Sequence, residues 1–163
     1  MNGWRAAVLT ISDRSARGEQ EDRSGPLLVE LLGVAGFDVV GRGLVPDDVG
    51  EIAGWMRQQC DESGVALICT TGGTGIAARD VTPEAIRSVI EREVPGIGEA
   101  MRSAGLHQTP MAMLSRSLAG IRGRTLIITF PGSPRAVQES FEAIAAVLPH
   151  ACELLAGRTG HNP

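Results

Sequence analysis

The sequence contains no lysine, and all fifteen of its basic residues are arginine. This absence excludes enzymes that form a Schiff base through lysine, including those that anchor pyridoxal phosphate. It also excludes a Walker A loop, whose lysine must reach the terminal phosphates of a nucleotide. Any phosphate group that this protein binds must therefore be held by other donors.

Aromatic residues are also few, because the chain has no tyrosine, three phenylalanines and two tryptophans. Surfaces that bind single-stranded nucleic acid stack the bases on exposed aromatic rings. The formal net charge of -4 is also unfavourable for contact with a phosphate backbone. We therefore expect no nucleic acid partner.

Long apolar runs are missing as well, since no segment approaches the roughly 20 apolar residues of a membrane helix. The apolar stretch 6–11 is interrupted by the polar segment 12–14, so it lacks the length and the flanks of a secretory signal. The length of 163 residues suits one domain over residues 1–163. We expect a cytoplasmic protein with no membrane partner.

Cysteine is scarce, and the three cysteines Cys60, Cys69 and Cys152 are widely spaced. An odd number at these spacings favours neither a disulfide framework nor a zinc site. Cys69 lies in the apolar run 65–69, where a buried structural thiol is expected.

Apolar runs of strand length alternate with segments of helical period along the whole chain. The expected strands cover residues 5–12, 37–45, 65–70, 115–121 and 125–130. The last two are joined at Arg122-Gly123 and predict a hairpin that adds an antiparallel strand. The pattern predicts an α/β fold in which helices cover a mostly parallel central sheet with one antiparallel edge hairpin.

Helix starts are indicated by small polar residues and by proline in the first turn. Ser24 with Pro26, Asp47, Thr82 with Pro83, and Ser133 with Pro134 are in such positions. A further short helix is expected over residues 97–104, after the break at Pro95-Gly96.

Ligands of open α/β sheets bind outside the carboxyl ends of the strands, where four unusual loops are expected. These loops cover residues 12–25, 46–48, 70–75 and 131–134. The run Gly72-Gly73-Thr74-Gly75 lies between a buried strand and a helix, so its backbone N–H groups can approach an anion closely. A tight turn alone would need one glycine, and the run therefore favours phosphate binding over a merely structural turn.

Asp47 and Asp80 follow two neighbouring strands and are candidates for a shared magnesium ion that bridges nucleotide phosphates. Each also has a structural alternative, since Asp47 can cap its helix and Asp80 can be a solvated turn residue. Their joint position beside a phosphate loop favours the functional interpretation.

Residues 100–138 contain five arginines and no acidic residue. Arginine grips phosphate oxygens with two parallel hydrogen bonds. Arg122 and Arg124 flank the expected hairpin and are interpreted as solubilising charges. Arg116 and Arg135 are interpreted as ligand contacts, and Ser133 as a helix cap.

The chain resembles the Mog-type family of molybdenum cofactor biosynthesis proteins, which includes the G domain of gephyrin. The resemblance spans nearly the whole sequence. It rests on Thr10-Ile11-Ser12-Asp13, Asp22-Arg23-Ser24-Gly25-Pro26, Val45-Pro46-Asp47, Gly72-Gly73-Thr74-Gly75, Arg79-Asp80-Val81-Thr82-Pro83-Glu84-Ala85, Met113-Leu114-Ser115-Arg116, Gly120-Ile121-Arg122-Gly123 and Pro131-Gly132-Ser133-Pro134.

The resemblance implies a three-layer α/β/α sandwich that forms a homotrimer. It also implies that the protein transfers AMP from ATP, with Mg2+, to the phosphate of molybdopterin and releases pyrophosphate. It implies that Asp47 and Asp80 are the catalytic and metal-binding pair, and that a separate protein inserts molybdate. The implied pterin and nucleotide contacts are Ser12, Asp13, Asp22, Ser24, Gly25, Thr71, Gly72, Gly73, Thr74, Gly75, Ser115, Arg116, Pro131, Gly132, Ser133 and Pro134.

Two alternatives stay open. One is a molybdopterin carrier of the same fold that performs no catalysis, against which the retained pair Asp47 and Asp80 argues. The other is a nucleotide pyrophosphatase of the competence-damage-inducible type, which shares the fold and differs in the loops after the first and last strands.

Overall fold

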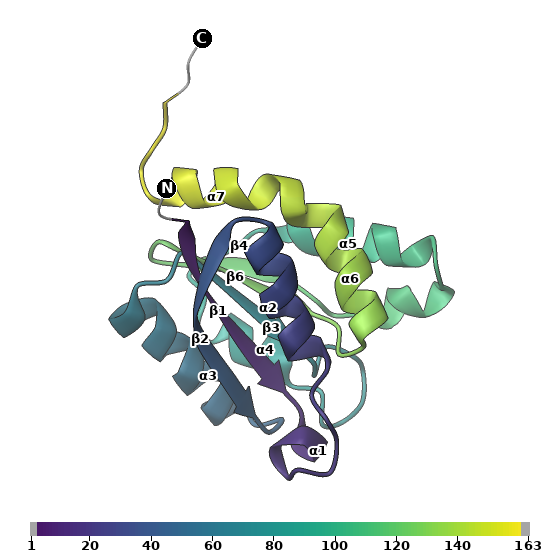
Figure 1. The fold of residues 1–163 in the computed structure, drawn as a ribbon. Coiled ribbons are helices and arrows are strands. Elements are labelled where there is room, and N and C mark those ends of the chain that lie inside the picture. The colour runs from purple at the N-terminus through teal and green to yellow at the C-terminus, as the bar shows by residue number, and fades with distance from the viewer. Residues whose placement is uncertain (1–2, 161–163) are drawn as a thin grey trace.

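The computed structural model describes residues 3–160 and contains a six-stranded sheet in the order β2-β1-β3-β6-β5-β4 (Figure 1). Strands β2, β1, β3 and β6 are parallel, while β5 is antiparallel to both β6 and β4. The predicted fold class is thus confirmed. The strands are β1 (Trp4–Ile11), β2 (Phe37–Val45), β3 (Leu67–Thr71), β4 (Arg92–Glu93), β5 (Ala119–Arg122) and β6 (Thr125–Phe130).

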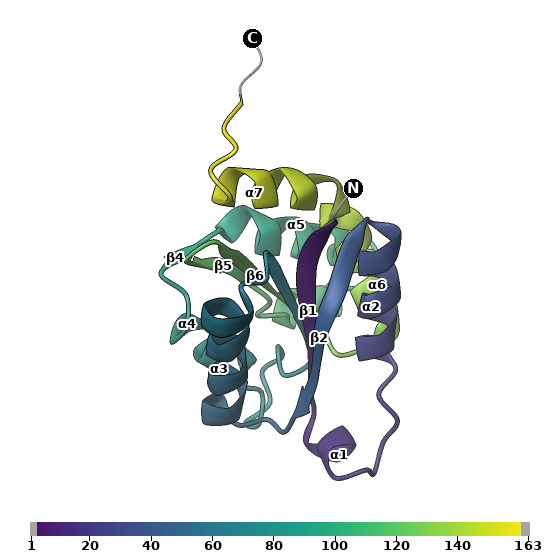
Figure 2. The same ribbon diagram turned by 60° about the vertical axis from the view of Figure 1, so that its left-hand side comes forward.

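Helices cover both faces of the sheet, with α3 and α4 on one side and α2, α5, α6 and α7 on the other (Figures 1 and 2). No helix within residues 3–160 has the length and apolar character to cross a membrane. The helical elements are α1 (Asp13–Ala16), α2 (Ser24–Val34), α3 (Val49–Gln58), η1 (Gln59–Ser63), α4 (Thr82–Arg87), α5 (Pro95–Leu106), η2 (Pro110–Leu114), α6 (Pro134–Ile144), η3 (Ala145–Val147) and α7 (Leu148–Leu155).

The alternation of side chains along the strands divides the core into two layers. In β3, Leu67 and Cys69 pack toward α2, α5, α6 and α7, whereas Ile68 packs toward α3 and α4. All five residues of β3 are buried, as expected for a central parallel strand. Cys69 is fully buried, which confirms the prediction of a buried thiol, and burial raises the pKa of this thiol above its ordinary value.

The region around the hairpin differs from the prediction in two respects. The first hairpin strand covers Ala119–Arg122 and not residues 115–121, because the Leu118 N–H donates to the Thr129 hydroxyl at 2.9 Å and leaves the regular ladder. The second difference is β4, a two-residue strand that pairs with β5 at the edge. Two residues give no alternating pattern, so the sequence carries no strand signal there.

Three predicted helix starts are also corrected. Asp48, and not Asp47, caps α3 by accepting the N–H of Glu51 at 2.9 Å. Thr82 caps no helix, because its hydroxyl donates to the carbonyl of Gly72 at 2.9 Å. Helix α5 begins at Pro95 and not at residue 97. Proline is tolerated in the first turn of a helix because the N–H that it lacks would have no hydrogen-bond partner there.

Candidate active site

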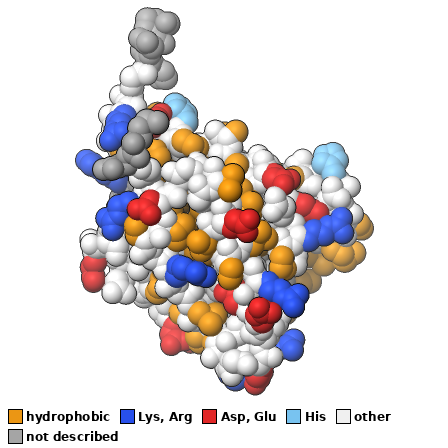
Figure 3. All heavy atoms as spheres, in the orientation of Figure 1, with side chains coloured by type: hydrophobic (Ala, Val, Ile, Leu, Met, Phe, Trp, Pro, Cys, Tyr) orange, Lys and Arg blue, Asp and Glu red, His pale blue; other side chains and the backbone are white. Residues whose placement is uncertain are grey.

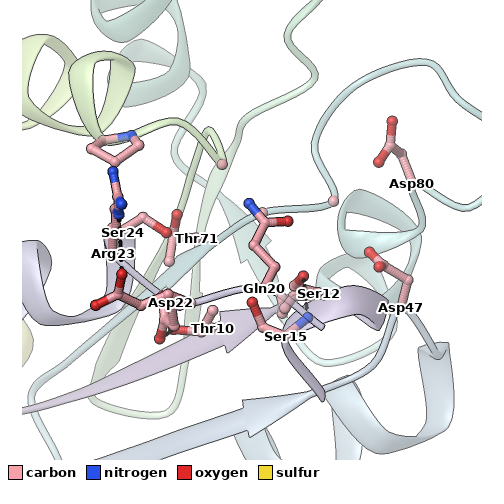
Figure 4. Close-up of a pocket in the computed structure, with 16 residues that line it drawn as sticks. Thr10, Ser12, Ser15, Gln20, Asp22, Arg23, Ser24, Asp47, Thr71 and Asp80 are labelled. Atoms are coloured by element: carbon pink, nitrogen blue, oxygen red, sulfur yellow. Dashed lines mark hydrogen bonds and ion pairs between the residues drawn. The ribbon is translucent and has the colours of Figure 1, made fainter. Parts of the chain in front are cut away.

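The loops after β1, β2, β3 and β6 meet at the carboxyl edge of the sheet and enclose a pocket of about 560 Å³ (Figure 4). We call this the polar pocket. Asp47 and Asp80 lie at one end of it, and Arg23 and Ser24 lie at the other. Its lining residues are Thr10, Ile11, Ser12, Ser15, Gln20, Glu21, Asp22, Arg23, Ser24, Asp47, Thr71, Gly72, Gly73, Asp80, Gly132 and Pro134.

A second, more apolar pocket of about 330 Å³ also includes Gly132 in its wall. We call this the apolar pocket. Between them the two pockets contain fourteen of the eighteen predicted site residues. The apolar pocket contains Thr74, Gly75, Ser115, Pro131 and Gly132. The four predicted residues that line neither pocket are Asp13, Gly25, Arg116 and Ser133.

The glycine-rich loop 72–75 forms the wall between the two pockets. Gly72 has a φ of 101°, and a Cβ on it would lie 2.1 Å from the carbonyl oxygen of Ile11, so only glycine fits. The hydroxyl of Thr71 donates to the Pro131 carbonyl at 2.7 Å and ties this loop to the one after β6. Within residues 3–160, the N–H groups of Gly73, Thr74 and Gly75 donate to no protein acceptor. The loop therefore presents three free donors of the kind that bind a phosphate.

The two aspartates lie against this loop on the side of the polar pocket. A Cβ on Gly73 would lie 2.9 Å from Asp47 Oδ1, and a Cβ on Gly75 would lie 2.8 Å from Asp80 Oδ2. Burial raises the pKa of Asp47 above its ordinary value, and the negative charges of Asp13 and Asp80 act in the same direction. Two carboxylates therefore lie together at this end of the polar pocket.

Asp13 holds Asp47 in place. The Asp13 N–H donates to Asp47 Oδ2 at 3.0 Å, and the Asp47 N–H donates to Asp13 Oδ1 at 3.0 Å. Arg79, the neighbour of Asp80, donates to both oxygens of Asp13 at 2.9 Å. Its guanidinium holds the pKa of the Asp13 carboxyl below its ordinary value. Asp13 is thus a positioning residue that connects the loops after β1, β2 and β3.

Arg116 holds the segment that carries Asp80. Its guanidinium donates to the carbonyls of Gly75 and Asp80, each at 2.7 Å, and pairs with the carboxylate of Glu84. Arg116 lies behind the loop and lines neither pocket, and a direct ligand contact of Arg116 stays a prediction. Arg135 pairs with Glu139 at 3.0 Å and does not line either pocket.

Asp22 and Gly25 fix the start of α2. Asp22 accepts the hydroxyl of Thr10 at 2.7 Å and the N–H of Gly25 at 3.0 Å. A Cβ on Gly25 would lie 2.3 Å from the Thr10 hydroxyl oxygen, so the helix can approach β1 this closely only with glycine. Ser133 caps α6 as predicted, by accepting the Ala136 N–H at 3.2 Å.

The structure adds pocket residues that the sequence reading missed. Arg23 is the only cationic side chain in the lining of the polar pocket, and it pairs with Glu21 at 3.3 Å. Arg23 lies inside the segment 22–26, which contributes to the family resemblance, but its residue type alone does not distinguish it from the other arginines as a pocket residue. In the apolar pocket the missed residues include Met111 and Leu114, whose side chains are 63% and 46% exposed. The missed residues of the polar pocket are Thr10, Ile11, Ser15, Gln20, Glu21 and Arg23.

A metal ion held by protein alone would need at least three ligands. Within the part of the chain that the structure describes, no three histidine, cysteine, aspartate or glutamate side chains gather in this way. Asp47 and Asp80 therefore form a two-carboxylate set, which suits a cation that takes its other ligands from substrate and water.

The chain is similar to a known protein family and to individual proteins. Residues 7–150 match the family described as a probable molybdopterin binding domain. A molybdopterin adenylyltransferase of Helicobacter pylori is 40% identical over 152 residues, which are 92% of this chain and 86% of that protein. The molybdenum cofactor synthesis protein cinnamon of Drosophila melanogaster is 45% identical over 91% of this chain, which spans only 25% of the Drosophila protein.

The chain is also similar to proteins whose structures have been solved. The molybdopterin biosynthesis enzyme MoaB of Thermus thermophilus is 49% identical, with a TM-score of 0.90 over 94% of this chain and 97% of the other. The protein CinA of Thermoplasma acidophilum is only 20% identical, with a TM-score of 0.70 over 88% of this chain and 98% of the other, and shares the fold alone. This chain therefore belongs to the family of molybdopterin-binding domains of molybdenum cofactor biosynthesis proteins.

Proposed function

We propose that this protein is a molybdopterin adenylyltransferase. In this reaction a terminal phosphate oxygen of molybdopterin forms a bond to the α-phosphorus of ATP, and the bond to the leaving pyrophosphate breaks. The observation that carries the proposal is the pair Asp47 and Asp80 beside three free N–H groups of the loop 73–75. The H. pylori and T. thermophilus relatives support it.

The chain's own groups act mainly by positioning and by electrostatic stabilisation. The N–H groups of Gly73, Thr74 and Gly75 donate to phosphate oxygens, and no rearrangement is needed because no protein acceptor within residues 3–160 occupies them. Arg23 offers a positive charge at the far end of the polar pocket. The attacking phosphate is already an anion, so no strong general base is required.

We further propose that Asp47 and Asp80 hold Mg2+ together with ATP. The residues fit such an ion, because both carboxylates lie at one end of the polar pocket, whereas Arg23, the cationic residue of its lining, lies at the other end. Mg2+ prefers one or two carboxylates plus substrate phosphates. When bound, it would supply charge neutralisation on the triphosphate.

The test is anaerobic incubation of the protein with molybdopterin and ATP, with and without Mg2+, followed by chromatography of adenylyl-molybdopterin and pyrophosphate. We expect Mg2+-dependent product from the natural protein. The Asp80→Asn variant should lose at least about 100-fold in turnover while it still binds molybdopterin. Equal losses of turnover and pterin affinity would contradict the role assigned to Asp80.

The same assay separates the carrier alternative. A carrier would bind molybdopterin with a defined stoichiometry and release no pyrophosphate from ATP. A pyrophosphatase of the competence-damage-inducible type would instead hydrolyse ADP-ribose-like substrates without molybdopterin.

The finer assignments from the family resemblance stay part of this proposal. We propose that residues 1–163 act as one domain, that the protein forms a homotrimer in the cytoplasm, and that a separate protein inserts molybdate. Light scattering on the purified chain tests the trimer, since a trimer has three times the mass of the chain.

A further inference from the structure

A third pocket, of about 730 Å³, lies at the opposite end of the sheet from the proposed active site. We call it the amino-end pocket, because it is formed where β1, β3 and β6 begin and where α7 ends (Figure 1). Several of its residues lie outside the matched segment 7–150. Its lining residues are Gly3, Trp4, Arg5, Cys60, Gly64, Val65, Ala66, Arg124, Thr125, Cys152, Glu153, Ala156 and Arg158.

Positive charge dominates the amino-end pocket, since Arg5, Arg124 and Arg158 line it against one carboxylate, Glu153. Seven other arginines of the chain each form an ion pair with a carboxylate. Within residues 3–160 these three form none, as do five other arginines, and what distinguishes the three is that they line one pocket. Figure 3 shows basic side chains gathered at the upper left, on the side where β1 begins.

The three guanidinium groups come from three separate segments of the chain. Arg5 uses one nitrogen to donate to the Ser63 carbonyl at 3.0 Å. The Arg158 guanidinium carbon lies 5.0 Å from the ring centre of Trp4, a distance at which a cation is attracted to the ring face. Arg124 projects from the tip of the β5–β6 hairpin and is exposed. Donors therefore remain available on all three sides of the pocket.

The surroundings of these arginines favour a peptide over a phosphate group. Two backbone amides of the pocket lining are occupied, since the Ala66 N–H donates to the Arg5 carbonyl at 2.8 Å and the Arg158 N–H to the Glu153 carbonyl at 2.9 Å. These two amides are not available to a phosphate, in contrast to the three free amides of the loop 73–75. Part of its lining is apolar, with Trp4 half-buried and Val65 only 2% exposed. Tryptophan and arginine together are typical of protein–protein contact sites.

We propose that the amino-end pocket is a docking site for an acidic peptide segment of a partner protein. Carboxylates of the segment pair with Arg5, Arg124 and Arg158, and an apolar side chain of the segment packs beside Trp4. The partner would dock at the end of the sheet away from the polar pocket, so substrate access to the proposed active site stays open during docking.

Trp4 provides a direct readout. The chain has only two tryptophans and no tyrosine, so a Trp55→Phe variant leaves Trp4 as the single indole fluorophore. The probe is a short peptide of alternating glutamate and leucine, titrated at low salt against this variant. We expect saturable change in Trp4 fluorescence, weaker binding at higher salt, and no response to the same peptide with glutamine in place of glutamate.

Substitutions assign the response to the pocket. Arg124→Gln and Arg158→Gln should each weaken peptide binding by about two- to fivefold, as expected for exposed ion pairs. Arg42→Gln is the matched control, because Arg42 is exposed on β2 and lines none of the three pockets. Far-UV circular dichroism checks that each variant is folded, and each titration is referred to its own spectrum without peptide.

The proposal is overturned if the arginine variants bind the peptide as tightly as the Arg42→Gln control, or if the glutamine peptide binds equally well. It is also overturned if inorganic pyrophosphate changes Trp4 fluorescence and displaces the peptide, since the pocket would then be a phosphate site. Adenylyl transfer is measured separately and should be unchanged in these variants, so the outcome does not depend on the proposed reaction.

Discussion

Asp13 and Asp47 each donate a backbone N–H to the other's carboxylate, and both donor–acceptor distances are 3.0 Å. This reciprocal pair joins the loops after β1 and β2, which are separated by 34 residues in the chain. Both oxygens of Asp13 also accept from Arg79. The position of Asp47 in the proposed active site is therefore set by backbone donors and by a neighbouring loop, and not by its own helix.

Asp47→Asn is expected to reduce adenylyl transfer by about 100-fold or more, because an amide retains the hydrogen bond from Asp13 and loses the charge. Asp48→Asn is the matched control, since it removes the same charge from the next residue, and asparagine caps a helix as well as aspartate does. Initial rates of pyrophosphate release measure the difference. Similar losses in both variants would mean that the general negative potential matters, and not a specific carboxylate.

The same Asp47→Asn variant is expected to be more stable than the natural protein at neutral pH without substrate. The folded-state pKa of Asp47 is raised, so its ionised form destabilises the fold once the pH exceeds the ordinary value of an aspartate. The melting temperature should rise by up to about 3 °C at pH 7 to 8. The gain should shrink as the pH falls through the folded-state pKa and vanish below the ordinary value of an aspartate, where Asp47 is protonated in both the folded and the unfolded state. A gain that grows toward acid pH would have the wrong sign.

Arg79→Gln is expected to lower turnover by about tenfold and to raise the KM for ATP, because it releases Asp13 and loosens the contact between two loops. Arg17→Gln is the control, since Arg17 forms an exposed ion pair with Glu19 in the same region. The stabilising effect of ionised Asp13 should also shrink in Arg79→Gln, and the difference in melting temperature should be lost as the pH falls below about 4. Equal kinetics in the two variants would show that Arg79 does not position the active site and is only a surface charge.

Much of the site could be predicted from the sequence, because its loops follow strands whose parallel direction was predicted. The strand order was not: Asp47 and Asp80 follow β2 and β3, which were expected to be neighbours, but β1 lies between them. The strand Phe37–Val45 has the predicted bounds, and β1 and β6 differ from prediction by one residue or less at each end. Parallel strands end at one edge, so Asp47, Asp80 and the glycine-rich loop had to come together.

The individual roles of these residues could not be predicted from the sequence. Neither spacing nor residue type shows that Asp13 contacts Arg79 across 66 residues, or that Arg116 holds a loop from behind. Both contacts depend on the path of exposed side chains between loops. The sequence also could not predict that Asp48, and not Asp47, caps α3. Adjacent aspartates have the same capping preference, and only the backbone geometry decides which of them caps the helix.

Gly73→Ala is expected to abolish most activity, because its Cβ would lie 2.4 Å from the Thr82 hydroxyl oxygen and 2.9 Å from Asp47 Oδ1. Gly123→Ala is the control: its φ of 56° is as unfavourable for alanine as the 67° of Gly73, but no atom lies within 4 Å of its Cβ. Both variants should lose about 1 kcal/mol of stability from backbone strain. Only Gly73→Ala should lose more than about tenfold in turnover at saturating ATP, and the same loss in Gly123→Ala would trace the effect to strain alone.

Arg116→Gln is expected to reduce turnover by about 10- to 100-fold at nearly unchanged molybdopterin affinity, because the loop from Gly75 to Asp80 loses its side-chain donors. Arg122→Gln is the matched control, since Arg122 also pairs with a carboxylate, Asp61, and donates to a backbone carbonyl, that of Val89. Both variants should lose comparable stability in urea unfolding, because each loses an ion pair and at least one backbone contact. A selective loss of turnover in Arg116→Gln then reports the position of Asp80, whereas parallel losses of turnover in the two variants would reduce Arg116 to a structural ion pair.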